Sequence, residues 1–131
     1  MKLKELLKAV DIISSPCQYP IDTEIESLCH ESRKTSEASV FVCMSGATVD
    51  GHDFAPSAYS RGCRFFIAER DLELPEDAFV FKVEDSRKSL ALLSACFFGH
   101  PANELHVIGI TGTKGKTTTA LTIYNILNTI K

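Results

Sequence analysis

The sequence predicts an α/β fold with a largely parallel sheet. Short apolar runs of strand length alternate along the chain with segments whose apolar residues recur at helical spacing. This alternation is typical of parallel strands joined by helical crossovers. The chain also has the material for a packed core, because 44% of its 131 residues are hydrophobic.

The first part of the chain predicts one helix and two strands. Leucines spaced as on one helical face predict a helix over residues 2–10. Residues 24–30 are an expected strand with a polar continuation. The unbroken apolar run at 40–44 has the length of a buried strand. These two strands are the expected start of the sheet.

The middle of the chain predicts a helix followed by two strands. Asp53 is the expected N-cap of a helix over 53–61, and Gly62 is the residue expected to end it. The apolar runs at 64–68 and 79–83 are expected strands, and an acidic loop joins them. Six phenylalanines in these runs and in the helix that follows are expected in the core: Phe65, Phe66, Phe79, Phe81, Phe97 and Phe98.

The last part predicts two helices around one more strand. Asp85 is the expected N-cap of a helix over 85–98. The turn-forming stretch 99–103 is the expected domain boundary, and it divides the chain into domains 1–104 and 105–131. A strand over 105–110 and a helix over 117–130 complete the expected elements, with a Gly/Thr loop between them.

Charge and cysteine content exclude several classes of protein. A net charge of −3 gives no electrostatic footprint for nucleic acid or for an anionic membrane. No apolar run approaches the length of a bilayer, and the N-terminus lacks the features of a signal peptide. The 5 cysteines are scattered and form no C-x-x-C pair. We therefore expect reduced thiols, a cytoplasmic location, no membrane insertion and no nucleic-acid partner.

The most distinctive motif is the Gly/Thr-rich loop at 109–118. An apolar strand is expected before it and a helix after it, which is the context of a phosphate loop. Glycines let backbone N–H groups turn toward an anion, and the helix N-terminus adds positive potential. Lys116 is expected against the β and γ phosphates of ATP, and the Thr117 hydroxyl on Mg²⁺.

The spacing of this loop departs from the usual G-x-x-x-x-G-K-[ST] pattern. Ile110 stands where that pattern has a glycine, and Gly109 and Gly112 form the turn instead. The alternative is a Gly/Thr-rich turn from strand to helix that binds nothing. The position of Gly-Lys-Thr-Thr at a helix start favours phosphate binding.

Together with three further segments, the loop resembles the Mur ligase family. The segments are His30-Glu31-Ser32-Arg33, Ser39 to Gly46, and Asp50-Gly51-His52-Asp53-Phe54, followed by Ala58 and Gly62. They are similar to the N-terminal domain pattern shared by the MurE and MurF types. The opening helix, residues 85–101 and Thr113 resemble the MurE type more closely.

The resemblance implies an ATP-dependent ligase of peptidoglycan precursor synthesis. Such enzymes activate the terminal carboxylate of a UDP-MurNAc-peptide as an acyl phosphate, and an incoming amino group displaces the phosphate. The MurE type adds a diamino acid to UDP-MurNAc-L-Ala-D-Glu, the expected ligand. The resemblance further implies that domain 1–104 binds the uridine end and that 105–131 begins the ATP-binding domain.

Site residues are implied position by position. His30 and Ser32 match the first uridine contacts of the family, and the second contact segment falls on Ala47, Thr48 and Val49. The ATP loop falls on Gly112, Thr113, Lys114, Gly115, Lys116, Thr117 and Thr118. Asp50-Gly51-His52 is expected to have a structural role that shapes the pocket around 47–49. Acidic side chains such as Glu69 are expected on solvated faces.

Three departures from the family pattern affect these expectations. Glu31 replaces the usual Asp, and Lys114 replaces a common Asn. The chain also ends one helix after the loop, so the family's acidic Mg²⁺ ligands and amino-acid pocket have no counterpart in it. We therefore expect no catalytic residues here and negligible ligase activity from this chain alone. The apolar residues of the helix over 117–130 cover much of its circumference, so we also expect self-association through 105–131.

Three other functions are considered at this point, and the first two stay open. The chain could belong to a MurF-type ligase, or it could be a non-catalytic module that binds UDP-sugars. A P-loop NTPase of another class is disfavoured, because its loop would stand near the start of the chain with about a hundred or more residues of ATPase domain after it.

Overall fold

The computed structural model describes residues 1–130. The chain divides into two compact units, Met1–His100 and Pro101–Lys131. In the described part, no helix is both long enough and apolar enough to cross a membrane.

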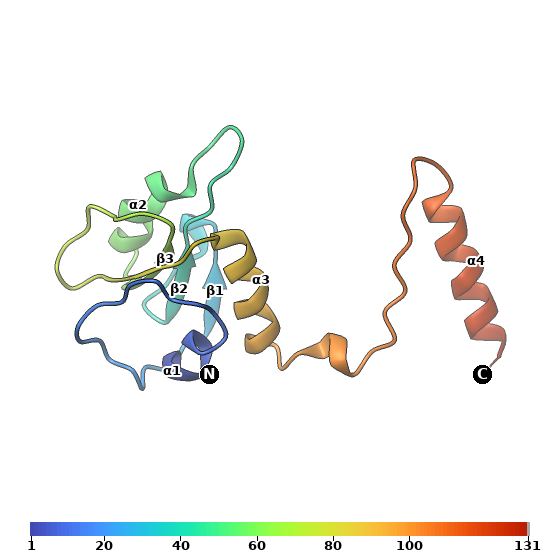
Figure 1. The fold of residues 1–131 in the computed structure, drawn as a ribbon, viewed down its shortest axis with the longest axis horizontal. Coiled ribbons are helices and arrows are strands. Elements are labelled where there is room, and N and C mark those ends of the chain that lie inside the picture. Colours follow the sequence, from blue (N-terminus) through green and yellow to red (C-terminus); the bar gives the residue numbers. More distant parts are fainter. Residues whose placement is uncertain (131) are drawn as a thin grey trace. The chain divides into compact units, whose positions relative to one another are not determined.

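The first unit is built on a four-stranded parallel sheet, which confirms the predicted fold class (Figure 1). Its strands are β1 (Ser27–Cys29), β2 (Ser39–Val42), β3 (Phe65–Ala68) and β4 (Phe79–Lys82), and they lie side by side in sequence order. The register aligns Val42 with Ile67, and Ile67 with Phe81. The carboxyl ends of all four strands therefore lie at one edge of the sheet.

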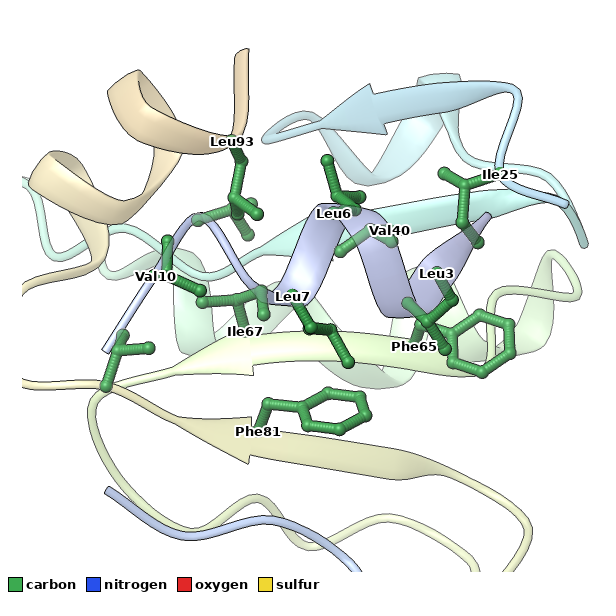
Figure 2. Packing of buried hydrophobic residues seen from close by; sticks show 12 residues of the cluster. Leu3, Leu6, Leu7, Val10, Ile25, Val40, Phe65, Ile67, Phe81 and Leu93 are labelled. Carbon is green, nitrogen blue, oxygen red and sulfur yellow. The ribbon is translucent and has the colours of Figure 1, made fainter. Parts of the chain in front are cut away.

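Alternation of side chains along the strands gives the sheet two apolar faces. Val40, Val42, Phe65 and Ile67 lie on one face. Figure 2 shows Val40, Phe65 and Ile67 packed with leucines of α1 (Leu3–Leu7) and with Leu93 of α3 (Ser86–Phe97). The opposite face carries Phe41, Phe66 and Ala68 and packs against Ala55 and Ala58 of α2 (Ala55–Ser60). Both faces are covered, as expected for a parallel sheet.

The buried thiols belong to the second of these clusters. Cys29, Cys43 and Cys63 are free and buried. Burial raises the pKa of the Cys43 thiol to about 12 and that of Cys63 to about 11. Cys43 and Cys63 therefore remain protonated at neutral pH and act as small apolar core residues.

The end of α1 and the start of α2 differ from the sequence-based prediction. Helix α1 ends at Leu7, because the next N–H groups bond three residues back, Ala9 to Leu6 and Val10 to Leu7, and tighten the last turn. The prediction of Asp53 as an N-cap is wrong. A 3-10 turn, η2 (Gly51–Phe54), precedes α2, and Asp50 caps this turn, while Phe54 stands at the N-cap position of α2 without a side-chain cap.

Other helix boundaries agree with the sequence. The Asp85 carboxylate accepts a hydrogen bond from the Lys88 N–H at 2.8 Å and caps α3, as predicted. Gly62 follows α2 with a φ of 99°, a value that favours glycine. Phe98 is 71% exposed, so its predicted place in the core is wrong.

The second unit contains η3 (Pro101–Asn103) and α4 (Lys116–Thr129). The prediction of a strand over 105–110 is wrong, because these residues form no strand. A parallel strand needs a neighbour for its backbone hydrogen bonds, and the described residues of this unit offer no second strand. Self-association through this segment stays a prediction.

Candidate functional site

Polar segments follow all four strands at the carboxyl edge of the sheet. Residues 30–32 follow β1, 45–50 follow β2, 69–70 follow β3 and 85–86 follow β4. In parallel α/β sheets, ligands bind in the crevice outside this edge. The edge is therefore the candidate site of the first unit.

The segment after β1 forms one wall of a small pocket. A 3-10 turn, η1 (Ser32–Lys34), follows β1, and Ser32 is 8% exposed. A pocket of about 190 Å³ is lined by His30, Glu31, Ser32, Arg33 and Phe54. The structure thus brings the predicted residues His30 and Ser32 together, and it adds Phe54, whose part in a site the sequence did not indicate.

The segment after β2 is a tight loop with the predicted residues at its tip. Ser45 and Asp50 pair across its base, and the Gly46 N–H donates to the Val49 carbonyl at 3.0 Å. Ala47, Thr48 and Val49 are exposed at the tip. They do not line the pocket of His30 and Ser32, so the two predicted contact segments form separate parts of the edge.

Gly51 is required at the base of this loop because the chain passes close to itself there. Its N–H donates to the Met44 carbonyl at 2.8 Å. A Cβ at this position would lie 2.6 Å from the Met44 carbonyl oxygen and 2.7 Å from its nitrogen. Any side chain would push the two backbone segments apart.

His52 connects the loop to the end of β3. It is 4% exposed, and its Nε2 accepts a hydrogen bond from the Glu69 N–H at 3.1 Å. Because Nε2 accepts, the ring proton lies on Nδ1, which donates to Asp50 Oδ1 at 2.6 Å. The His52 N–H donates to the same oxygen and, as the largest cause, lowers the pKa of Asp50. This arrangement confirms the structural role predicted for Asp50-Gly51-His52.

Arg70 strengthens the same connection from the next residue of the chain. Its Nη2 lies 2.9 Å from Asp50 Oδ2 and 3.5 Å from Asp53 Oδ1. Since Arg70 follows Glu69, the first two residues after β3 both bind the Asp50–His52 end of the loop after β2.

Glu69 is exposed, as predicted for a solvated side chain, and it also joins three elements at the edge. Its Oε1 accepts hydrogen bonds from the Ser86 N–H at 2.9 Å and from Ser86 Oγ at 2.7 Å, at the start of α3. Its Oε2 accepts from Ser45 Oγ at 3.2 Å. The Ser86 hydrogen bonds lower the pKa of the Glu69 carboxyl. No local sequence signal indicates this role, because Ser86 and Ser45 lie far from Glu69 along the chain.

A larger pocket of about 440 Å³ lies beside His52, and its charge disfavours an anion. Arg70 contributes one positive charge to its lining, whereas Asp53, Asp71 and Glu73 contribute three carboxylates. Like charges repel, so a diphosphate is better matched by the smaller pocket.

The phosphate loop of the second unit leaves the start of α4 open to an anion. Gly115 precedes the helix with a φ of 77°, Gly112 has a φ of 148°, and no side chain caps the helix. Lys116 Nζ donates to the Gly112 carbonyl at 2.6 Å, so the cation lies over the loop. Uncapped N–H groups, glycine turns and a lysine at a helix start fit a phosphate group.

Metal binding has less support in the described residues. Thr117 and Thr118 are exposed in the first turn of α4, where a hydroxyl could join a metal held by phosphate oxygens. Residues 1–130 contain no group of three or more His, Cys, Asp or Glu side chains that could hold a metal ion by itself.

Sequence comparisons find a matching family model and several similar curated proteins. The family model "Mur ligase family, catalytic domain" matches residues 24–98. The chain is 39% identical over 127 residues to the UDP-N-acetylmuramoyl-L-alanyl-D-glutamate–2,6-diaminopimelate ligase of Clostridium perfringens, covering 97% of this chain and 26% of the relative. It is 46% identical over 121 residues to the ligase of that name in Bacillus cereus, covering 92% and 24%. The chain spans about a quarter of the length of these curated relatives.

Solved structures show the same fold. Crystal structure II of MurF from Acinetobacter baumannii matches 90% of this chain and 25% of its own, with a TM-score of 0.71 and 30% identity. MurF ligase from Thermotoga maritima in complex with ADP matches 82% and 24%, with a TM-score of 0.58 and 35% identity.

The family model covers more than half of the chain. The chain belongs to the Mur ligase family.

Proposed function

We propose that this chain supplies the uridine-binding domain and the phosphate loop of an ATP-dependent ligase of the MurE type. Such a ligase joins a diamino acid to UDP-MurNAc-L-Ala-D-Glu in the cytoplasm. The observation that carries the proposal is a polar, braced edge of a parallel sheet in a chain 39% and 46% identical to 2,6-diaminopimelate ligases.

Two parts of the carboxyl edge have the chemistry to hold the uridine end. The Ser32 hydroxyl makes no hydrogen bond to other described residues, and no buried side-chain polar atom among them lacks a partner. The hydroxyl therefore faces space that a ligand can reach, next to His30. The tip of the loop after β2 presents Ala47, Thr48 and Val49, whose backbone groups can bond a base or ribose.

The phosphate loop has the chemistry to hold ATP. Residues 112–118 would contact its phosphates, with Lys116 as the neutralising cation and Thr117 as a ligand of the accompanying Mg²⁺. Bound ATP supplies the phosphoryl group that activates the substrate carboxylate. Thr118 and the N–H groups of the first turn would orient the phosphates.

A MurF-type ligase is the second candidate, because the two solved structures described above are MurF ligases. Their identity to this chain is 30% and 35%, whereas the diaminopimelate ligases reach 39% and 46%. The sequence relation therefore favours the MurE type.

Base selectivity in calorimetric titrations tests the proposal. UDP-MurNAc-L-Ala-D-Glu is titrated into the chain, with UMP and AMP as the minimal uridine and adenosine ligands. The proposal predicts saturable binding of the first two and no binding of AMP to the same site. Failure of both uridine ligands to bind a folded chain would contradict it.

A further inference from the structure

Phe54 is an exposed aromatic side chain in the pocket that also contains Ser32. It is 45% exposed, and it lines the pocket of about 190 Å³ together with His30, Glu31, Ser32 and Arg33. Neither apolar core cluster includes it. Exposed aromatic surface beside polar groups in a concave site indicates ligand binding, whereas scattered exposed apolar residues need no such reason.

The backbone that leads into Phe54 is held by several hydrogen bonds. Phe54 is the last residue of η2, and the Asp50 side chain accepts from the His52 N–H at the start of that turn. The Asp53 N–H donates to the Asp50 carbonyl at 3.2 Å. The buried His52 ring then connects the turn to the end of β3 through the Glu69 N–H. Ligand binding therefore requires little ordering of this residue, which preserves affinity.

The rest of the pocket is polar in a way that suits a flat heterocycle. The Ser32 hydroxyl can donate to or accept from the edge of a base. Among residues 1–130, Arg33 makes no ion pair, whereas the Glu31 carboxylate is paired with Lys34 at 2.8 Å. One aromatic wall, one hydroxyl and one unpaired cation match a pyrimidine ring that carries a phosphorylated ribose.

We propose that Phe54 stacks on the uracil ring of the nucleotide substrate and that it contributes to affinity for the base. This inference rests on the proposed function, since it assigns the base of that ligand to the pocket of Ser32. Base–aromatic stacking contributes about 1–3 kcal/mol per base. Removing the ring should therefore weaken binding about fivefold to more than a hundredfold.

The sequence offers a direct reporter, because it contains no tryptophan. Phe54→Trp creates a single tryptophan in the proposed stack. Titration with UMP should change its emission saturably, whereas the 5′-monophosphate of dihydrouridine, whose ring is not aromatic, should bind more weakly and change it less. The matched control is Phe98→Trp, at a residue that is 71% exposed and lies outside the pocket, and its emission should not respond.

Affinity measurements on substitutions separate stacking from folding. Phe54→Tyr should keep UMP affinity close to wild type, and Phe54→Leu should lose affinity while thermal unfolding shows a folded chain. Equal UMP affinity of wild type and Phe54→Leu would overturn the inference and leave the proposed function standing. Absence of UMP binding by the wild-type chain would also overturn the inference, and failure of UDP-MurNAc-L-Ala-D-Glu to bind the same folded chain would overturn the proposed function as well.

Discussion

The imidazole of His52 accepts a hydrogen bond from the backbone N–H of Glu69 at 3.1 Å, which joins the turn before α2 to the end of β3. Through its other ring nitrogen, His52 holds Asp50, the residue that closes the loop carrying 47–49. A single buried side chain therefore connects the candidate substrate loop to the central sheet.

Replacing His52 by alanine should destabilise the first unit. The Glu69 N–H would lose its acceptor, and an unsatisfied buried group costs about 1–3 kcal/mol. Urea denaturation should show a lower midpoint for His52→Ala, while His106→Ala, at an exposed residue of the second unit, should leave it unchanged. Equal midpoints would show that the connection through His52 contributes nothing to stability.

Gly51→Ala should be strongly disruptive. Its Cβ would lie 2.6 Å from a backbone oxygen, so the loop base must open, and overpacking of this kind costs about 1–3 kcal/mol. Thermal unfolding measures the effect. Gly109→Ala is the matched control, because nothing lies within 4 Å of its added Cβ. A melting temperature of Gly51→Ala equal to that of the control would contradict the close approach of Gly51 to Met44.

Acid should weaken the first unit partly through Glu69. Its pKa in the folded chain lies below the ordinary value of 4.5, chiefly because the Ser86 N–H and hydroxyl donate to it. The stabilisation is therefore fully present above that value and is lost as the pH falls through the folded pKa. The free energy of unfolding, measured with urea from pH 7 to pH 3, should fall below about pH 5.

Substitution of Glu69 isolates its share of this acid effect. Glu69→Gln should be less stable at pH 7 and should show a smaller fall on acidification. The fall that remains should come from the other carboxyl groups whose pKa values are lowered, which are Asp22, Glu31, Asp50 and Asp77. Glu76→Gln serves as the control because no hydrogen bond to another residue in 1–130 engages that carboxylate. Parallel pH profiles for wild type and Glu69→Gln would exclude the role assigned to Glu69.

Lys116→Ala should weaken ATP binding more than a change at Lys114. A hydrogen bond from a charged group contributes about 1.5–3 kcal/mol, so the expected loss is about ten- to a hundredfold. Lys116 already lies over the loop, bonded to the Gly112 carbonyl at 2.6 Å. Lys114→Asn is the matched comparison within the same loop. Calorimetric titration with ATP compares the three chains, and similar affinities would remove Lys116 from the site.

The sequence predicts the local elements well, because their signals are local. The apolar runs of β2, β3 and β4 and the Asp85 cap of α3 are visible in short windows of the chain. The error at 105–110 has a different origin, since a strand exists only when another strand pairs with it. An apolar run alone does not contain that information.

The sequence indicates individual residues of the candidate site, but it does not indicate the hydrogen bonds that join their segments. His30, Ser32 and 47–49 were located through motifs. The part of Glu69 depends on Ser86 and Ser45, which the fold brings together from distant positions. The sequence around Phe54 does not distinguish it from an ordinary residue at a helix start, because its exposed fraction and its pocket depend on the fold.

The most direct test of the account is a calorimetric titration of UDP-MurNAc-L-Ala-D-Glu into wild type and Ser32→Ala. Ser57→Ala is the control, because Ser57 is an exposed residue of α2 outside the pocket. We predict saturable binding by wild type and by Ser57→Ala and clearly weaker binding by Ser32→Ala. Equal affinity of all three chains, or no binding by a folded wild-type chain, would contradict the assignment of the carboxyl edge as the uridine site.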